Sequence, residues 1–195
     1  KSFQLTTLID TYLSNLFLDT LMISSTLFLA YDFYKMAYKR FRAAFVINIL
    51  SILKLIPVLF MTSFILNSFA FYITQQSGSH NQQILIELLK ENQAFIIFQA
   101  LIYAPILEEL LFRGIFYGLF VKKNKWLAML ISGLLFGCAH MWTTSFTLSD
   151  LAFLPAYSSL GIIIAYSYAQ SKSIISPMLL HFFNNLIGIL ALMML

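Results

Sequence analysis

Charged residues and cysteines are both scarce in this sequence. Asp, Glu, Lys and Arg together make up 10% of its 195 residues, and Cys138 is its one cysteine. A single cysteine excludes an internal disulfide and any zinc site built from several thiolates. The sequence also lacks an H-E-x-x-H motif, an internal repeat and a low-complexity tract. These absences argue against disulfide-rich, zinc-finger and repeat proteins.

Apolar residues dominate instead. They form 60% of the chain, 20 of them are Phe, and the mean hydropathy of +0.83 exceeds that of ordinary soluble domains. We predict an all-α, polytopic membrane protein with about six transmembrane helices, because each long apolar run can cross a bilayer. The predicted spans are residues 12–31, 44–74, 93–121, 126–141, 151–169 and 174–195. Residues 1–92 would hold two spans and an outer amphipathic segment, and residues 93–195 a core of four spans.

The basic residues are distributed unevenly between the predicted connections. Segments 35–42 and 122–125 and the single residue Lys172 hold 4, 3 and 1 of them, whereas the other side of the membrane receives only Lys1 and Lys90. Because positively charged segments stay in the cytoplasm, we predict a multi-pass plasma-membrane protein of bacterial type, with both ends of this sequence outside. We expect segment 35–42 to be a loop. The net charge of +4 then reflects orientation, and no nucleic-acid partner is expected.

The third predicted span contains the stretch P-I-L-E-E-L-L-F-R, residues 105–113. Ionisable side chains at membrane depth are costly, so they usually face a bundle interior and mark a functional site. At helical spacing Glu109 and Arg113 form an i,i+4 pair, whereas Glu108 points elsewhere and has no basic partner on its helix. We predict a structural Glu109–Arg113 ion pair and an available carboxylate at Glu108; an ion-pair network without chemistry is the alternative. Pro105 should free the backbone carbonyl four residues before it.

Two further spans carry polar residues one helical turn apart. His140 ends the motif F-G-C-A-H, and His181 begins H-F-F-N-N, which ends in Asn184 and Asn185. Counted from the predicted cytoplasmic ends, Glu108, His140 and Asn185 lie roughly 20 Å deep and His181 roughly 12 Å. One layer thus receives a carboxylate that can take a proton from water, imidazoles that can hold the water, and amide donors for an oxyanion. Hydrolysis of a buried peptide bond needs such a set.

These motifs resemble those of the CPBP family of intramembrane endopeptidases, which includes CAAX proteases and bacteriocin-processing enzymes and is also called the Abi family. The family pattern is E-E-x-x-x-R, then F-x-x-x-H, then H-x-x-x-N, which here begin at Glu108, Phe136 and His181. Each motif is weak by itself, but all three occur in order. The resemblance covers about residues 94–195 and implies a helical catalytic core of four spans.

The resemblance also implies roles for individual residues. The implied catalytic set is Glu108, His140, His181 and Asn185, and the implied structural ion pair is Glu109 with Arg113. The glutamate and the first histidine would activate water, while the second histidine and the asparagine would stabilise the oxyanion. Asn184, at i+3 from His181, is open as an alternative to Asn185.

A metal site is the main chemical alternative. Glu108, His140 and His181 could form a His2Glu zinc site with one open coordination position. The sequence has no H-E-x-x-H helix, so the zinc ligands would come from three separate spans, and this alternative stays open. Of zinc-dependent and metal-independent hydrolysis, the metal-independent chemistry is favoured, so we expect no cofactor.

The predicted activity is hydrolysis of peptide bonds in membrane-associated or lipid-anchored proteins or peptides. Its partners would be the lipid bilayer and a peptide or lipidated protein substrate. A non-catalytic membrane partner, such as a bacteriocin-immunity protein or a signalling scaffold, is the first alternative. A transporter is less favoured, because the chain has no repeat or second set of polar spans.

Overall fold

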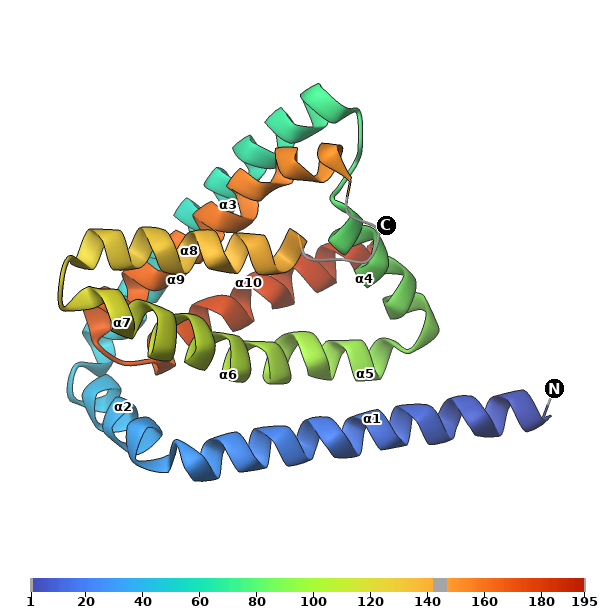
Figure 1. The fold of residues 1–195 in the computed structure, drawn as a ribbon, viewed down its shortest axis with the longest axis horizontal. Coiled ribbons are helices and arrows are strands. Elements are labelled where there is room, and N and C mark those ends of the chain that lie inside the picture. The colour runs from blue at the N-terminus through green and yellow to red at the C-terminus, as the bar shows by residue number, and fades with distance from the viewer. Residues whose placement is uncertain (1, 142–146, 195) are drawn as a thin grey trace.

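The protein is a bundle of helices, as seen in a computed structural model that describes residues 2–141 and 147–194 (Figure 1). No strand occurs among these residues. The elements are α1 Ser2–Leu29, α2 Tyr31–Ala43, α3 Phe45–Thr74, α4 His80–Glu91, α5 Gln93–Phe98, η1 Gln99–Tyr103, α6 Ala104–Glu109, η2 Leu110–Tyr117, α7 Gly118–Val121, α8 Lys125–Met141, η3 Leu148–Phe153, α9 Leu154–Ser171 and α10 Ile175–Met193. Elements α5 to α7 follow one another without a break and form one rod, in which η1 and η2 have π-helical register.

Five helical stretches are long and apolar enough to cross a membrane, which confirms the prediction of a polytopic all-α protein. They are Tyr12–Leu29, Phe45–Thr74, Gln93–Val121, Leu148–Ser171 and Ile175–Met193. The shorter apolar helix α8 lies at the remaining predicted span, and its 17 residues extend about 26 Å. Residues 142–146 and Leu195, which fall in the predicted core, lie outside the described residues.

The basic segment 35–42 is helical, so the predicted loop is wrong. It belongs to α2, whose Ala37 and Phe41 are one turn apart and buried against the bundle. No Gly or Pro interrupts this apolar face, and an amphipathic helix therefore forms. Arg40 Nη1 donates to the Lys172 carbonyl oxygen at 3.1 Å, which fixes α2 to the turn after α9.

The two ends of the bundle differ in charge. Helix α2, the α7–α8 turn and the α9–α10 turn lie at one end, while α4 and the chain termini lie at the other (Figure 1). The basic segments therefore gather at a single end, as the charge pattern predicted. Helix α4 lies in the predicted amphipathic segment, and Ser79 caps it by accepting a hydrogen bond from the Gln82 backbone N–H at 3.2 Å.

The main hydrophobic core joins α3 to the four predicted core spans. Its largest buried members include Ile52 and Leu59 of α3, Phe112 of η2, Phe136 of α8, Ile164 of α9 and Leu180 of α10. Helix α3 thus packs in the same core as the motif-bearing helices, although it belongs to the predicted amino-terminal part. Helix α1 instead lies along the edge of the bundle beside the rod (Figure 1), where Gln99 Nε2 donates to Asp19 Oδ2 at 2.7 Å.

Helices α8 and α9 approach each other through glycines. A Cβ atom added at Gly161 would lie 2.9 Å from the Cα atom and the carbonyl oxygen of Gly133, and one at Gly137 would lie 2.9 Å from the Ser158 nitrogen. Gly133 and Gly137 are four residues apart and share one face of α8. Small residues at this spacing let membrane helices pack backbone against backbone.

We expect Gly161→Ala to lower the thermal midpoint of the purified protein in detergent, because overpacking of this kind costs about 1–3 kcal/mol. Gly118→Ala is the matched control, since a Cβ atom there meets nothing within 4 Å. The control should unfold at the wild-type temperature or slightly above it. Equal midpoints for the two variants would contradict the close approach of α8 and α9.

Candidate active site

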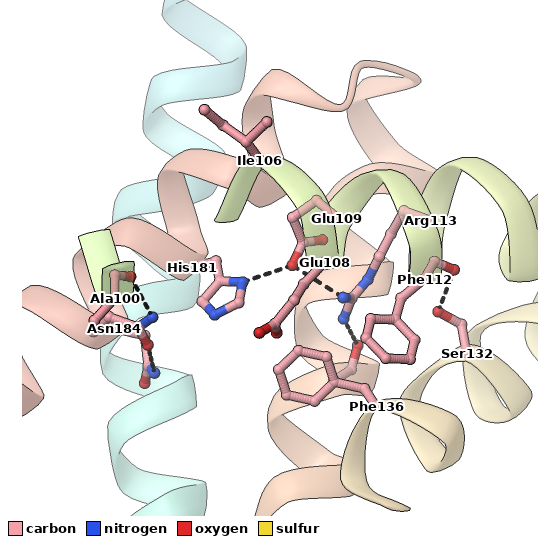
Figure 2. A network of polar contacts seen from close by, with 12 residues as sticks. Ala100, Ile106, Glu108, Glu109, Phe112, Arg113, Ser132, Phe136, His181 and Asn184 are labelled. Atoms are coloured by element: carbon pink, nitrogen blue, oxygen red, sulfur yellow. Dashed lines mark hydrogen bonds and ion pairs between the residues drawn. The ribbon is translucent and has the colours of Figure 1, made fainter. Parts of the chain in front are cut away.

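Glu109, Arg113 and His181 form a buried polar network in the middle of the bundle (Figure 2). Arg113 Nη1 lies 3.0 Å from Glu109 Oε1, which is the predicted i,i+4 contact, and both side chains are 0% exposed. His181 Nδ1 of α10 lies 2.8 Å from the same carboxylate oxygen. Arg113 Nη2 also donates to the Gly161 carbonyl oxygen of α9 at 2.6 Å. One carboxylate therefore links the rod directly to α10 and, through Arg113, to α9.

Aromatic and polar groups surround this network. The Arg113 guanidinium lies 5.0 Å from the Phe136 ring centroid, a favourable position for a cation over a ring face. Tyr34 of α2 donates its hydroxyl to the Ile106 carbonyl oxygen at 3.2 Å. Burial and the negative charge of Glu109 raise the pKa of Tyr34 to about 12, so this hydroxyl stays protonated and remains a donor.

Glu108 extends in another direction, toward His140 of α8. Its Oε2 lies 4.0 Å from His140 Nε2, which is too long for a hydrogen bond but short enough for one water to contact both atoms. His140 Nδ1 lies 3.0 Å from the Phe136 carbonyl oxygen. Since that oxygen can only accept, Nδ1 carries a proton, and in a neutral imidazole Nε2 then presents a lone pair toward Glu108. The imidazole stacks between the rings of Phe136 and Tyr157, with centroid distances of 4.3 and 5.1 Å.

The two glutamates thus differ in access. The side chain of Glu108 is 30% exposed and that of Glu109 is 0% exposed. Glu108 Oε2 itself is buried and has no hydrogen-bond partner among the described residues, so its capacity to accept a hydrogen bond is unfilled. Adjacent residues of one helix point about 100° apart, which is how one carboxylate reaches the network and the other reaches His140.

The π-helical segment η1 determines the position of Asn185. In η1 the Ala104 N–H pairs with the Gln99 carbonyl, five residues back. The next donor in this register would be Pro105, which has no N–H. The freed carbonyl is therefore that of Ala100, five residues back, and the predicted spacing of four was wrong because the helix is wider here. Asn185 Nδ2 donates to the Ala100 oxygen at 2.8 Å.

Both asparagines line the same cavity. Asn184 Nδ2 donates to Asn185 Oδ1 at 3.0 Å, so the two amide groups are coupled. An amide nitrogen carries two N–H groups, and each of these therefore keeps one for another acceptor.

A single cavity of about 490 Å³ collects the predicted residues. Its walls include Glu108, His140, His181, Asn184 and Asn185. The structure therefore brings together the whole predicted catalytic set and the alternative asparagine. The predicted ion pair lies behind this wall, where His181 contacts it.

His181 is more constrained than its implied role requires. It is 2% exposed, and its Nδ1 faces the Glu109 carboxylate. With Nδ1 as the donor, a neutral ring offers only an acceptor at Nε2, and it could donate to an oxyanion only when protonated. The asparagines have N–H groups to donate in any case.

Several parts of the cavity wall were not predicted. They come from Phe60, Ser63 and Asn67 of α3, from Asn81 and Gln82 of α4, and from Tyr157 of α9. The Tyr157 hydroxyl lies 2.9 Å from Ser79 Oγ, which links the ring stacked on His140 to the start of α4. None of these residues belongs to one of the three sequence motifs. The only sequence feature that pointed to this part of the wall was the polar face of segment 75–92.

The predicted zinc ligands do not form a metal cage in this arrangement. His181 Nδ1 contacts Glu109, which leaves Nε2 as the one ring nitrogen that could bind a metal. Among the described residues, no group of three His, Cys, Asp or Glu side chains is placed to hold a metal ion. As positioned, these side chains do not fit the His2Glu alternative.

The chain belongs to the family described as type II CAAX prenyl endopeptidase, Rce1-like, which matches residues 90–187, half of the sequence. The matched stretch contains all the residues of the predicted set.

Three curated relatives share this region. YdiL of Bacillus subtilis, named as a candidate membrane peptidase, is 34% identical over 108 residues, which are 55% of this chain and 41% of YdiL. MroQ of Staphylococcus aureus, named as a membrane-embedded CAAX protease, is 32% identical over 117 residues, 56% of this chain and 44% of MroQ. The UPF0177 protein YvdC of Lactococcus lactis is 32% identical over 133 residues, which are 68% of this chain and 48% of YvdC. The chain spans less than half the length of these relatives, and no solved structure matches it.

We expect Glu109→Ala and Arg113→Ala to reduce the yield of folded protein and its thermal midpoint. Removing one partner leaves an uncompensated buried charge, which costs about 3–5 kcal/mol. Glu108→Gln is the matched control, because Glu108 is partly exposed and the glutamine side chain has nearly the same volume as the glutamate side chain. It should fold nearly as well as wild type in detergent melting. If all three variants melted alike, the separation of the two glutamates would be wrong.

Proposed function

We propose that this protein is an intramembrane endopeptidase that hydrolyses peptide bonds of membrane-associated or lipid-anchored proteins or peptides. The observation that carries the proposal is the 4.0 Å separation of Glu108 Oε2 and His140 Nε2 at the wall of the 490 Å³ cavity. Membership in an endopeptidase family supports it.

In the proposed reaction, a water molecule donates hydrogen bonds to Glu108 Oε2 and to the His140 Nε2 lone pair. Glu108 takes a proton from this water as its oxygen attacks the carbonyl carbon of the scissile peptide bond. The tetrahedral intermediate collapses when the C–N bond breaks and Glu108 returns the proton to the leaving amine. The reaction consumes one water and releases two peptide ends, a new carboxyl end and a new amino end.

The oxyanion of the tetrahedral intermediate needs donors that are fixed before the reaction. The free N–H groups of Asn184 and Asn185 supply them in our proposal, because the Asn185 amide is already anchored on the Ala100 carbonyl. His181 then acts as a positioning residue, which holds the Glu109 carboxylate and forms part of the wall behind the amides. This assignment differs from the resemblance, which gave His181 a direct role at the oxyanion.

The proposed chemistry uses no metal, because a carboxylate with a free oxygen and a fixed imidazole acceptor can orient and deprotonate water. The proposed location is a bacterial plasma membrane, with the bilayer and a peptide or lipidated protein as partners. MroQ, named as a membrane-embedded CAAX protease, supports a substrate of this class.

Purified protein in proteoliposomes, incubated with a peptide library and analysed by mass spectrometry, tests the proposal. Wild type should cleave, before and after dialysis against a chelator. Glu108→Gln, His140→Ala and Asn185→Ala should each lose on the order of 100-fold or more in rate, the usual scale for a base or oxyanion partner.

Glu87→Gln is the matched control, because Glu87 is exposed on α4 and does not line the cavity. It should cleave at the wild-type rate. Undiminished turnover by Glu108→Gln would overturn the assignment of the reaction to this site. One zinc per chain, lost and regained together with activity, would overturn the metal-free step only.

A further inference from the structure

The outer face of helix α2 carries a cluster of cations. Lys35, Lys39 and Arg42 recur at the spacing of one and two helical turns, so they share one face of this helix, and all three are exposed. A hollow of about 530 Å³ lies against them, and Tyr38 and Ala43 complete its lining. We refer to the three cations as the basic face. Its hollow is within the size range of small-molecule sites.

The protein does not neutralise the basic face. Every ion pair among the described residues lies in the candidate active site, far along the chain from α2. Lys35 Nζ instead lies 5.5 Å from the Tyr31 ring centroid. Asp32 is the one acidic residue of α2, and it forms no ion pair with any of the three cations. The face therefore keeps a net positive charge that a bound anion can complement.

Helix α2 lies at the surface of the membrane. Its 13 residues connect two candidate spans, Tyr12–Leu29 and Phe45–Thr74, with one residue at each junction. These spans enter and leave the hydrocarbon core, so the helix between their ends falls in the headgroup layer, where the phosphates of the lipids are found. The turns before α8 and before α10 lie at the same end of the bundle (Figure 1).

The opposite face of α2 is fixed to the bundle. The side chains of Ala37 and Phe41 are buried there. Ser173 Oγ donates to the Ala37 carbonyl oxygen at 2.7 Å, and Asn48 Nδ2 donates to the Phe41 carbonyl oxygen at 3.0 Å. The three cations are therefore held at set positions on a packed helix. A ligand that binds a preorganised surface pays less to order it than one that binds a flexible basic loop.

We propose that the basic face binds the phosphate of one anionic phospholipid headgroup. The guanidinium of Arg42 can donate to two phosphate oxygens, the two lysines supply point charges, and the Tyr38 hydroxyl is a further donor. A free phosphate compound offers the same chemistry. The membrane position favours the lipid, because basic pockets beside membrane spans meet anionic headgroups at high local concentration. This inference does not depend on the peptidase function.

Native mass spectrometry of the full chain in a neutral detergent tests the proposal, with phosphatidylglycerol and phosphatidylcholine titrated in parallel. Each cation near an anionic lipid surface contributes about fivefold in affinity. We therefore expect one phosphatidylglycerol to bind on the order of tenfold or more tightly than phosphatidylcholine. Equal affinities for the two lipids would overturn the inference.

Two triple variants with equal loss of charge assign the binding to α2. The first replaces the three cations of the basic face with Gln, and the second replaces Lys122, Lys123 and Lys125, which are exposed at the same end and do not line the hollow. The first should lose on the order of tenfold or more in affinity for phosphatidylglycerol and keep its affinity for phosphatidylcholine. The second should bind both lipids as wild type does. Equal losses in the two variants would show a general effect of charge and overturn the site.

A single substitution keeps the test available should the first triple variant fail to fold. Lys39→Gln, at an exposed residue of the basic face, should lose about fivefold in affinity for phosphatidylglycerol. Lys123→Gln is its matched control and should lose nothing. Equal affinities of these two variants would overturn the inference.

Inorganic phosphate distinguishes a lipid from a free phosphate compound as the ligand. Acyl chains add apolar burial that a free phosphate lacks, so a molar excess of inorganic phosphate should leave phosphatidylglycerol bound. Displacement of the lipid by this excess would assign the face to free phosphate compounds and overturn the proposal.

Discussion

A buried carboxylate shared by an arginine and a histidine is the contact on which the rest of this structure depends. Glu109 lies on the long rod, Arg113 reaches from it to the Gly161 carbonyl of α9, and His181 reaches Glu109 from α10. Each charge would be costly if it were unpaired at this depth. The helices must therefore keep the geometry that holds these three side chains together, including the glycine contact that lets α8 and α9 approach each other.

This fixed network leaves the neighbouring glutamate available. Glu108 points about 100° away from Glu109 around the helix, with one oxygen free of hydrogen bonds from the described residues and His140 4.0 Å away. The proline and the π-helical segment before it serve the same site, because they free the Ala100 carbonyl that anchors Asn185. A buried ion pair and a π-helical segment thus lie beside a carboxylate, an imidazole and two amides that line one cavity.

Much of this arrangement could be predicted from residue types and spacing. The apolar runs predicted the spans, and the i,i+4 spacing predicted the Glu109–Arg113 contact. The partner of His181 could not be predicted, because helical spacing relates residues of one helix and says little about contacts between helices. The carbonyl freed by Pro105 was placed one residue off, since local sequence does not reveal π register.

The walls of the cavity were also beyond prediction. Tyr157, Asn67 and Gln82 are ordinary residues at the polar ends or faces of their helices, and only the packing of α3, α4 and α9 makes them neighbours. The basic segment 35–42 is a helix rather than the predicted loop, because its apolar residues Ala37 and Phe41 recur at helical spacing and are buried.

The central claim is that Glu108 performs chemistry while Glu109 maintains structure, and chemical rescue by formate tests it most directly. Removing the Glu108 side chain should leave space on the cavity where a small carboxylate can act as the base, whereas the site of Glu109 is closed to solvent. Turnover by Glu108→Ala in proteoliposomes should rise about tenfold or more with added formate, within the range of general-base catalysis, and turnover by Glu109→Ala should not rise. Rescue of Glu109→Ala alone, or of both variants to the same extent, would contradict the account.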